Sequence, residues 1–276
     1  MRRPIKCWRD HNVSPTLLNS MKKILLPIFF LSPLLIFAQR DSIPSGIYSW
    51  KRPVQNVQKN ILTSVLFEGS AHDLKFLQMS ANALLPAKTK NTLQVPDDEE
   101  HLLLMKTGTL TIGLKDSSWS IGAGSIALLM PGEKYSLQNS NQDSCNYYLM
   151  KYSSKLPINT TRGKTSGGSF VKDWNKIQFT PHERGGIRNY FERPTAMCKR
   201  LEMHLTTLKE GIKSHEPHKH RAEEIVLVID NKTEMQIADN FYKGSAGDVY
   251  YLGSNVSHAI RNDGKEPCMY FAFQFE

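Results

Sequence analysis

The sequence predicts an all-β protein made of two β-barrels in tandem, and three observations lead to this prediction. Beyond about residue 40, short runs rich in Val, Ile, Leu, Tyr and Phe alternate with Gly, Asn, Asp and Pro. Helical periodicity is rare in the same region, and part of the pattern recurs about 124 residues later. Many short strands with frequent turn signals are typical of a β-sandwich or β-barrel, and the recurrence indicates two copies of one unit.

Several of the apolar runs have the length and composition of β-strands. They are Leu102–Met105, Leu110–Leu114, Ser125–Met130, Tyr147–Tyr152, Ile225–Ile229, Asp248–Leu252 and Met269–Phe275. Successive side chains of a strand point to opposite faces. If Tyr270 and Gln274 line the interior of the second barrel, then Phe271, Phe273 and Phe275 pack outward, against the other barrel or a second subunit.

Short matches align the two copies. At an offset of 124, residues 77–79 (LQM) match 201–203 (LEM), and the glutamates at 99–100 match those at 223–224. After a slip of one residue, 123–124 match 246–247, and Asn139 matches Asn262. The repeat predicts a first barrel at residues 61–153 and a second at 191–276, with a strap at 39–60 before them. Residues 154–190 are polar and rich in Gly, Ser, Thr and Lys, so we predict a linker there.

The first 38 residues have the pattern of a secretory signal peptide. Two lysines precede an apolar run at residues 24–37, which ends at Ala38. Prolines interrupt this run, and it is shorter than the roughly 20 residues that a membrane span needs. We therefore expect an exported protein, periplasmic or extracellular, with no stable membrane span once the leader is cleaved. Met21 is a natural start, which would make residues 1–20 a wrongly extended reading frame, and a retained N-terminal anchor is the alternative.

The formal net charge of +9 comes mostly from this leader. Residues 1–38 contain six Lys or Arg and one Asp, a net of +5, which leaves +4 for the rest of the chain. No clustered basic stripe remains, so we expect no nucleic-acid partner.

Three cysteines follow the leader, and none forms a CxxC pair. This argues against a zinc ribbon or a thioredoxin-like site. Cys198 and Cys268 lie in the first and last strands of the second copy, where an oxidising compartment would allow a disulfide. We expect two buried free thiols instead.

The second copy carries a group of residues with metal-ligand chemistry, namely His218, His220, Glu224 and His258. On a strand, His218 and His220 point to the same side, and Glu224 lies an even number of residues further on. Turn residues between short strands bring His258 across the same barrel interior. Three imidazoles and one carboxylate that converge in this way make a metal site with open positions for a substrate. His215, just before this group, is expected on a loop.

The spacing of these residues resembles the two motifs of the cupin superfamily. The first motif is represented by Gly211, the His218–His220 pair, Glu224 and Asn231, and the second by Gly247, Gly253, His258 and Asn262. The departures are Gly for Pro and Asn for Gly at turn positions, and one extra residue before the first histidine, none of which replaces a ligand. The resemblance covers residues 61–276 and implies two double-stranded β-helix, or jelly-roll, barrels.

The first copy lacks this set of ligands. In the repeat alignment, Gln94, Pro96 and Tyr135 stand where the second copy has its histidines. Glu100 is retained, and His101 is expected on the opposite face of the strand. One carboxylate and one tyrosine do not make a transition-metal site, so we predict that this barrel packs against its partner without a metal. A pocket for a non-metal ligand is the secondary interpretation.

The arrangement also resembles the bicupin (S)-ureidoglycine aminohydrolase group, which has a GxYxW-type leading segment, a metal-poor first barrel and a Mn(II)-binding second barrel. Gly46, Tyr48 and Trp50 carry that segment here. The resemblance implies metal-dependent hydrolysis that releases ammonia from a small ureido compound, although the group's ligand set includes a glutamine and has a different order. In such a reaction Glu202, His204 and Tyr270 are the candidates for proton handling or pocket lining.

Two alternatives stay open at this stage. One is a metal-dependent dioxygenase of the quercetinase type, whose ligand set of three His and one Glu this sequence matches. The other is a non-enzymatic cupin that binds a small molecule or a sugar. The ligands favour Mn(II) or Fe(II), and Zn, Ni or Co also fit. We favour an enzyme with a small-molecule substrate and expect a homo-oligomer.

Overall fold

The computed structural model describes residues 41–276 except 54 and 59, and of residues 54–59 no side chain is described. The signal peptide, the start at Met21 and the cleavage site expected within residues 1–38 lie outside the described residues.

The described residues form strands with very little helix. The first barrel contains β2 (Gln55–Gln58), β3 (Ile61–Gly69), β4 (Leu74–Leu84), β5 (Asn91–Gln94), β6 (Glu100–Thr107), β7 (Thr109–Leu114), β8 (Ser117–Gly122), β9 (Ile126–Leu129), β10 (Lys134–Gln138), β11 (Cys145–Ser154) and β12 (Phe170–Lys172). The second contains β1 (Gly46–Tyr48), β13 (Thr180–His182), β14 (Gly185–Arg193), β15 (Leu201–Leu208), β16 (Glu223–Asp230), β17 (Lys232–Ile237), β18 (Asn240–Ser245), β19 (Val249–Leu252), β20 (His258–Asn262) and β21 (Cys268–Phe275). Helical residues are α1 (Thr160–Thr165) and a 3-10 turn, Trp174–Lys176.

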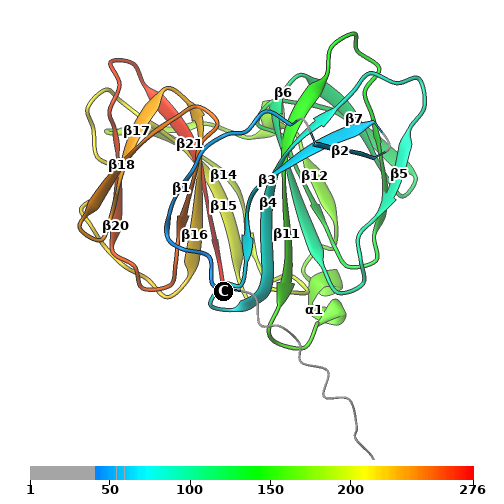
Figure 1. Cartoon of the computed structure of the whole chain (residues 1–276), viewed down its shortest axis with the longest axis horizontal. Helices are drawn as coiled ribbons and strands as arrows, with labels where there is room; N and C mark the ends of the chain where they lie inside the picture. Colours follow the sequence, from blue (N-terminus) through cyan, green and yellow to red (C-terminus); the bar gives the residue numbers. More distant parts are fainter. Residues whose placement is uncertain (1–40, 54, 59) are drawn as a thin grey trace, which may run out of the picture. The chain divides into compact units, whose positions relative to one another are not determined.

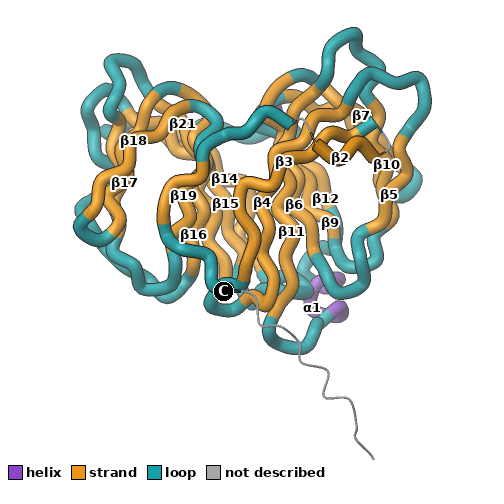
Figure 2. Tube along the Cα trace, in the orientation of Figure 1, coloured by secondary structure: helices purple, strands orange, loops and turns teal. Residues whose placement is uncertain are grey.

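Each barrel pairs a seven-stranded sheet with a smaller sheet. Figures 1 and 2 show the two barrels side by side. The large sheets have the strand orders β12-β9-β6-β11-β4-β3-β2 and β1-β19-β16-β21-β15-β14-β13. The small sheets are β5-β10-β7-β8 and β18-β17-β20. The prediction of two tandem jelly-roll barrels is confirmed, and the strands expected from the apolar runs are present as β6, β7, β9, β11, β16, β19 and β21.

The two repeats exchange their first strands. β1 pairs with β19 of the second barrel, whereas β12, which follows it by 124 residues, pairs with β9 of the first barrel. The repeat therefore begins at Gly46, earlier than the sequence matches indicated. The segment 154–190 expected as a linker contains α1, β12 and β13 and the start of β14, so it contributes strands to both barrels.

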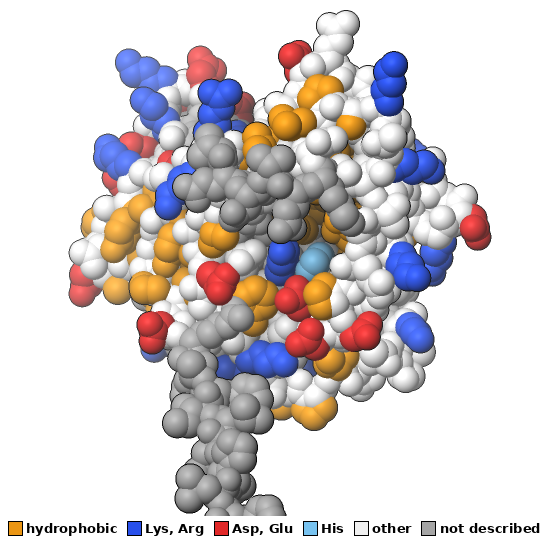
Figure 3. Space-filling view, turned by 45° about the vertical axis from the view of Figure 1, so that its right-hand side comes forward, with side chains coloured by type: hydrophobic (Ala, Val, Ile, Leu, Met, Phe, Trp, Pro, Cys, Tyr) orange, Lys and Arg blue, Asp and Glu red, His pale blue; other side chains and the backbone are white. Residues whose placement is uncertain are grey.

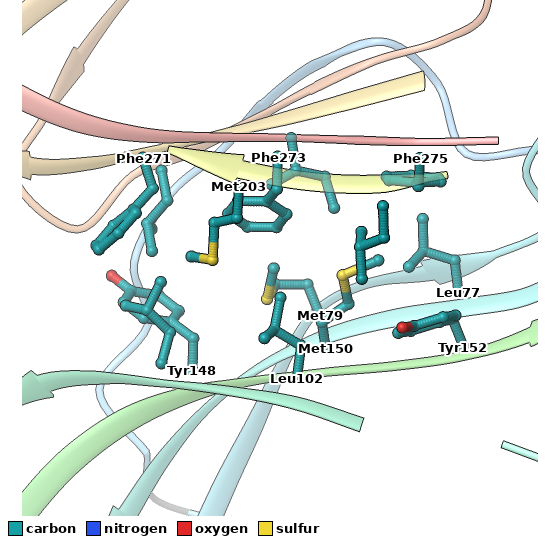
Figure 4. Close-up of a cluster of buried hydrophobic side chains, with 14 of the residues drawn as sticks. Leu77, Met79, Leu102, Tyr148, Met150, Tyr152, Met203, Phe271, Phe273 and Phe275 are labelled. Atoms are coloured by element: carbon teal, nitrogen blue, oxygen red, sulfur yellow. The ribbon is translucent and has the colours of Figure 1, made fainter. Parts of the chain in front are cut away.

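Side chains from the facing large sheets form the core between the barrels (Figure 4). Phe271, Phe273 and Phe275 of β21 belong to this cluster, together with Met79 and Tyr148 of the first barrel. Each of the three phenylalanines is at most 1% exposed. The opposite face of β21, with Tyr270 and Ala272, belongs to the separate core inside the second barrel. The outward packing expected of the phenylalanine stripe is therefore found against the other barrel.

The register of the strands corrects the alignment of the glutamates. Glu100 lies opposite Tyr152, and Glu223 lies opposite Phe275, so the two pairs are related by an offset of 123. His101 consequently occupies the position of Glu224, and Glu100 occupies that of Glu223. A slip of one residue exchanges the faces of a strand. The expectation that Glu100 is the retained counterpart of the metal-ligand glutamate was wrong.

Glu100 and Glu223 instead connect the two barrels. Glu100 of the first barrel binds the segment that precedes β15, and Glu223 of the second barrel binds the segment that precedes β4. Glu100 is completely buried and accepts hydrogen bonds from the Thr195 hydroxyl (2.7 Å) and from the backbone N–H groups of Ala196 (2.7 Å) and Met197 (3.3 Å). Glu223 accepts one from the backbone N–H of His72, at 2.7 Å. His72 and Ala196 are again 124 residues apart, so these contacts repeat across the interface.

Cys145, Cys198 and Cys268 are buried free thiols, as expected. Cys198 belongs to the core between the barrels and Cys268 to the interior of the second barrel, which separates the two thiols considered for a disulfide. Within the part of the chain that the structure describes, no helix has the length and hydropathy needed to cross a membrane.

Candidate metal centre

The two histidines of the first motif lie in a loop that is fastened to β20. His218 forms an isolated antiparallel bridge with His258, in which the His218 N–H donates to the His258 carbonyl at 3.1 Å and the reverse bond is 2.9 Å. The backbone N–H of Asn255 then donates to the carbonyl of His220 at 2.8 Å. His218 and His220 were expected on a strand, but His218 forms only an isolated bridge, and β16 begins at Glu223. The extended backbone still turns both imidazoles to one side.

Three imidazoles meet at this point. The ligand nitrogens of His218, His220 and His258 all lie within 4.8 Å of one another. Their ring centroids are 4.7 Å apart for His218 and His258, 5.0 Å for His220 and His258, and 5.3 Å for His218 and His220. Three histidines that converge from a loop and a strand of the barrel have the donor chemistry and spacing for one transition-metal ion.

The backbone orients two of the rings toward the group. Nδ1 of His220 lies 2.7 Å from the Ala222 carbonyl, and Nδ1 of His258 lies 2.9 Å from the Val256 carbonyl. When Nδ1–H donates to these oxygens, Nε2 keeps its lone pair for a metal. Nε2 of His258 is buried and has no hydrogen-bond partner among the described residues. Because an unsatisfied buried nitrogen is costly, this atom fits a metal ligand better than a structural histidine.

Glu224 lies beside two of the three imidazoles. One carboxylate oxygen, Oε2, is 3.1 Å from Nε2 of His220 and 3.4 Å from Nε2 of His258. Burial tends to raise the pKa of the Glu224 carboxyl, but hydrogen bonding and charge from His220 and His258 outweigh it and hold that pKa well below its usual range. The carboxylate is therefore ionised next to the imidazoles. It is not within 4.8 Å of all three, so His218 is the ligand furthest from it.

The histidines have different electrostatic surroundings. Burial lowers the pKa of His218, and the neighbouring imidazoles of His215 and His258 lower it further. The hydrogen bond with Glu224 raises the pKa of His220. His215, which was expected on a loop, packs its ring edge-on against His218 at 4.2 Å. It lies outside the three-imidazole group and supports the least buried ligand of that group.

Gln274 completes the immediate surroundings of the carboxylate. Its amide Nε2 donates to Oε2 of Glu224 at 3.1 Å and lies 3.4 Å from Nε2 of His220. Its inward direction was expected from strand alternation, but its contact with the candidate ligands was not. Only the pairing of β21 with β16, which sets Gln274 opposite Glu224, reveals this contact.

A second polar pair lies on the same interior face. Glu202 is registered opposite Gln274, and its carboxylate Oε1 is 2.9 Å from Nδ1 of His204. The hydrogen bond with His204 lowers the pKa of Glu202 against the effect of burial, and the charges of His204 and Arg200 lower it further. The Arg200 guanidinium also donates to Glu202 and, at 3.2 Å, to Gln274. Glu202, Gln274 and Glu224 thus form a polar row across three neighbouring strands.

Tyr270 faces the same interior but at another level. It is opposite Val228, four residues along β21 from Gln274, which corresponds to roughly 13 Å of strand. Burial raises the pKa of its phenol, and its hydroxyl interacts with Ser214 and Thr206. Of the three candidates for proton handling, Glu202 and His204 form a hydrogen-bonded pair, whereas Tyr270 belongs to a separate set of hydroxyls.

Comparison with known proteins agrees with this geometry. Residues 204–273 match the family model described as Cupin domain. Among solved structures, AerE from Microcystis aeruginosa is 14% identical with a TM-score of 0.62, and the match covers 83% of this chain and 99% of AerE. Protein Ylba from E. coli is 13% identical with a TM-score of 0.62, covering 81% and 87% of the two chains. The comparison with curated proteins gave no match.

A third similar structure is that of an enzyme in complex with formate. The formate complex of oxalate decarboxylase from Lactobacillus farciminis is 14% identical with a TM-score of 0.62, and the match covers 84% of this chain and 86% of that one. At such identities, similarity shows the fold and leaves the activity open. The match to the domain model spans His204, the four candidate ligands and β21 up to Phe273. The part of the second barrel that contains the candidate ligands thus matches a cupin domain, and the similar solved structures extend the shared fold to most of the chain.

Proposed function

We propose that the second barrel holds one divalent transition metal and that the protein is a metal-dependent enzyme acting on a small molecule. The observation that carries this proposal is the group of three imidazoles within 4.8 Å, in which the buried Nε2 of His258 faces the Glu224 carboxylate at 3.4 Å. His218, His220, Glu224 and His258 are the proposed ligands. Their nitrogen and oxygen donors favour Mn(II) or Fe(II). A bound ion would act as a Lewis acid that binds and polarises the substrate.

We propose hydrolysis that releases ammonia from a small ureido compound as the reaction. The hydrogen-bonded pair of His204 and Glu202 supports this class, because an imidazole oriented by a carboxylate is suited to general acid–base work. When Nδ1–H of His204 donates to Glu202, its Nε2 is left to accept a proton. Arg200 holds the Glu202 carboxylate, and Gln274 restrains Glu224 through its amide. The glutamine beside the ligands also agrees with the aminohydrolase resemblance.

The experiment is an ammonia-release assay on the metal-loaded full chain with a panel of small ureido compounds. His204→Gln is expected to keep the metal and to lower turnover by about 100-fold, the usual contribution of a general acid–base group. His182→Gln, an exposed histidine of β13 with no place in the site, is the matched control and is expected to keep the rate. No ammonia from any compound with stoichiometric metal bound would contradict the hydrolase proposal.

A dioxygenase of the quercetinase type is the second candidate, and its support is the ligand set of three His and one Glu. The same substrate screen, repeated without oxygen, separates the two. A hydrolase keeps its rate, whereas a dioxygenase stops. A binding protein would hold the metal and a ligand but would convert no compound of the panel, with or without oxygen.

A further inference from the structure

The first barrel contains a cavity of about 560 Å³ at the level where the second barrel has its imidazole group. Tyr135 of β10 lies opposite Leu93 of β5, as His258 lies opposite His218. His101 occupies the position of Glu224, as the strand registers show. Leu93, His101 and Tyr135 all line the cavity. The fold therefore provides both barrels with an interior site at the same height.

The polar rows of the two sites have opposite charge. In the first barrel, Lys151 of β11 is registered between Gln78 of β4 and His101 of β6. The equivalent row of the second barrel is Glu202, Gln274 and Glu224. Two carboxylates in one barrel are thus replaced by an amide and an imidazole in the other, and the central amide is replaced by an ammonium. A row that suits a cation has become a row that suits an anion.

Lys151 lacks a counter-ion within the protein. Its side chain is half-buried and lines the cavity, and it forms no hydrogen bond or ion pair with any described residue. The ammonium is close enough to His101 to lower the pKa of that imidazole, in addition to the larger effect of burial. A partly desolvated charge without a partner is unfavourable, and an anion in the cavity would remove this cost.

Glu99 is the acidic residue of the cavity wall, and its carboxylate forms a hydrogen bond with His101. Its Oε2 lies 2.8 Å from Nε2 of the imidazole. The other ring nitrogen, Nδ1, is buried without a hydrogen-bond partner among the described residues, and the His101 side chain is only 6% exposed. Figure 3 turns the first barrel toward the viewer and shows that basic and acidic side chains both occur on this face. Glu99 is therefore engaged by His101, and the ammonium of Lys151 is left without a partner among the described residues.

The remaining lining of the cavity suits a ligand with an apolar body. It consists of aliphatic side chains, two tyrosines and a few neutral polar groups, among them Ile61, Leu93, Leu149, Tyr135, Tyr147 and Asn82. We propose that the first barrel binds a small organic monocarboxylate, with the carboxylate at Lys151 and an aromatic or aliphatic body against these walls. This site is separate from the metal centre and goes beyond the proposed function.

Calorimetric titration of the full chain with benzoate, 4-hydroxybenzoate and octanoate tests the proposal, and benzamide serves as the uncharged isostere of benzoate. At least one carboxylate is expected to bind, at least tenfold more tightly than benzamide. Lys151→Met is expected to weaken that binding at least tenfold, whereas Lys151→Arg retains most of it. Lys75→Met, which removes an exposed lysine of β4, is the matched control and leaves binding unchanged.

Two further measurements keep the result interpretable. Since Lys151 has no partner, Lys151→Met is expected to raise the unfolding midpoint of the ligand-free protein, which also shows that the variant folds. His258→Ala is expected to bind the carboxylate normally. Carboxylate binding that survives in Lys151→Met, binding that disappears in His258→Ala, or no binding by any of the three acids would each overturn the proposal.

Discussion

The two barrels share one scaffold and differ in a few interior positions. The large sheets of both have equivalent strands and matching registers, and even the buried glutamates at the interface correspond. Yet one interior has three imidazoles with a carboxylate beside two of them, and the other has a cavity whose polar and apolar lining includes Lys151 and His101. The difference teaches that the fold supplies a position for a site, whereas two or three side chains decide whether that site suits a cation or an anion.

The sharpest test of this comparison removes one side chain at the same position of each barrel. His258→Ala removes the buried Nε2, which lies 3.4 Å from Oε2 of Glu224 within the candidate ligand group. Metal content, measured by elemental analysis of purified protein, is expected to fall from stoichiometric to near zero, because three-histidine sites depend on every ligand. Tyr135→Ala is expected to leave metal content unchanged. Equal loss in both variants would contradict a single site in the second barrel.

How far the sequence could predict this arrangement depends on the strand. In β21 the polar residues Tyr270 and Gln274 alternate with phenylalanines, so the two faces could be assigned before the fold was known. In β6 and β16 both faces are buried, as Leu102, Leu103 and Leu104 illustrate. Alternation then carries no information about direction. The identity of the two glutamate pairs consequently suggested an offset of 124 where the structure has 123.

Long-range pairing accounts for the other differences. The exchanged strands β1 and β12 differ in sequence, and the shared feature is the tryptophan two residues after each, Trp50 and Trp174. No local feature of either segment identifies its partner strand. In the same way, the loop around His218 and His220 takes its extended form from bonds to His258 and Asn255, not from its own propensity. The ligand types and their spacing were readable in the sequence, whereas the contact of Gln274 with Glu224 needed the pairing of two strands far apart in the chain.

The buried interface glutamates offer a second comparison, with a smaller effect. Glu100 uses both carboxylate oxygens as acceptors, whereas His72 N–H and the Tyr251 hydroxyl both bond to Oε1 of Glu223, and its Oε2 is buried without a partner. Glu100→Gln turns one acceptor into a donor facing the Thr195 hydroxyl, so it is expected to cost about 2–4 kcal/mol. Glu223→Gln can keep its single working acceptor and should cost about 1 kcal/mol.

Denaturant unfolding of both variants measures this difference. The free energy of unfolding is expected to fall further for Glu100→Gln than for Glu223→Gln, and the dependence of this free energy on denaturant concentration is expected to stay the same in both variants. A larger loss for Glu223→Gln would mean that the unpartnered oxygen is held by a contact that the two barrels do not share, and the interface would then be less symmetrical than its hydrogen bonds indicate.

The smallest expected effect concerns two tyrosines that connect the barrels at equivalent glycines. The Tyr148 hydroxyl of the first barrel donates to the carbonyl of Gly247 at 2.7 Å, and the Tyr190 hydroxyl of β14 donates to the carbonyl of Gly124 at 2.8 Å. Both hydroxyls are buried, so Tyr148→Phe and Tyr190→Phe should each cost about 1 kcal/mol, the usual net value of one such bond. Chemical denaturation is expected to give two losses that agree within about 0.5 kcal/mol. If the two losses in free energy of unfolding differ several-fold, the two hydrogen bonds between the barrels are unequal in strength. Equal losses would mean that the barrels differ in their interiors and not in these contacts.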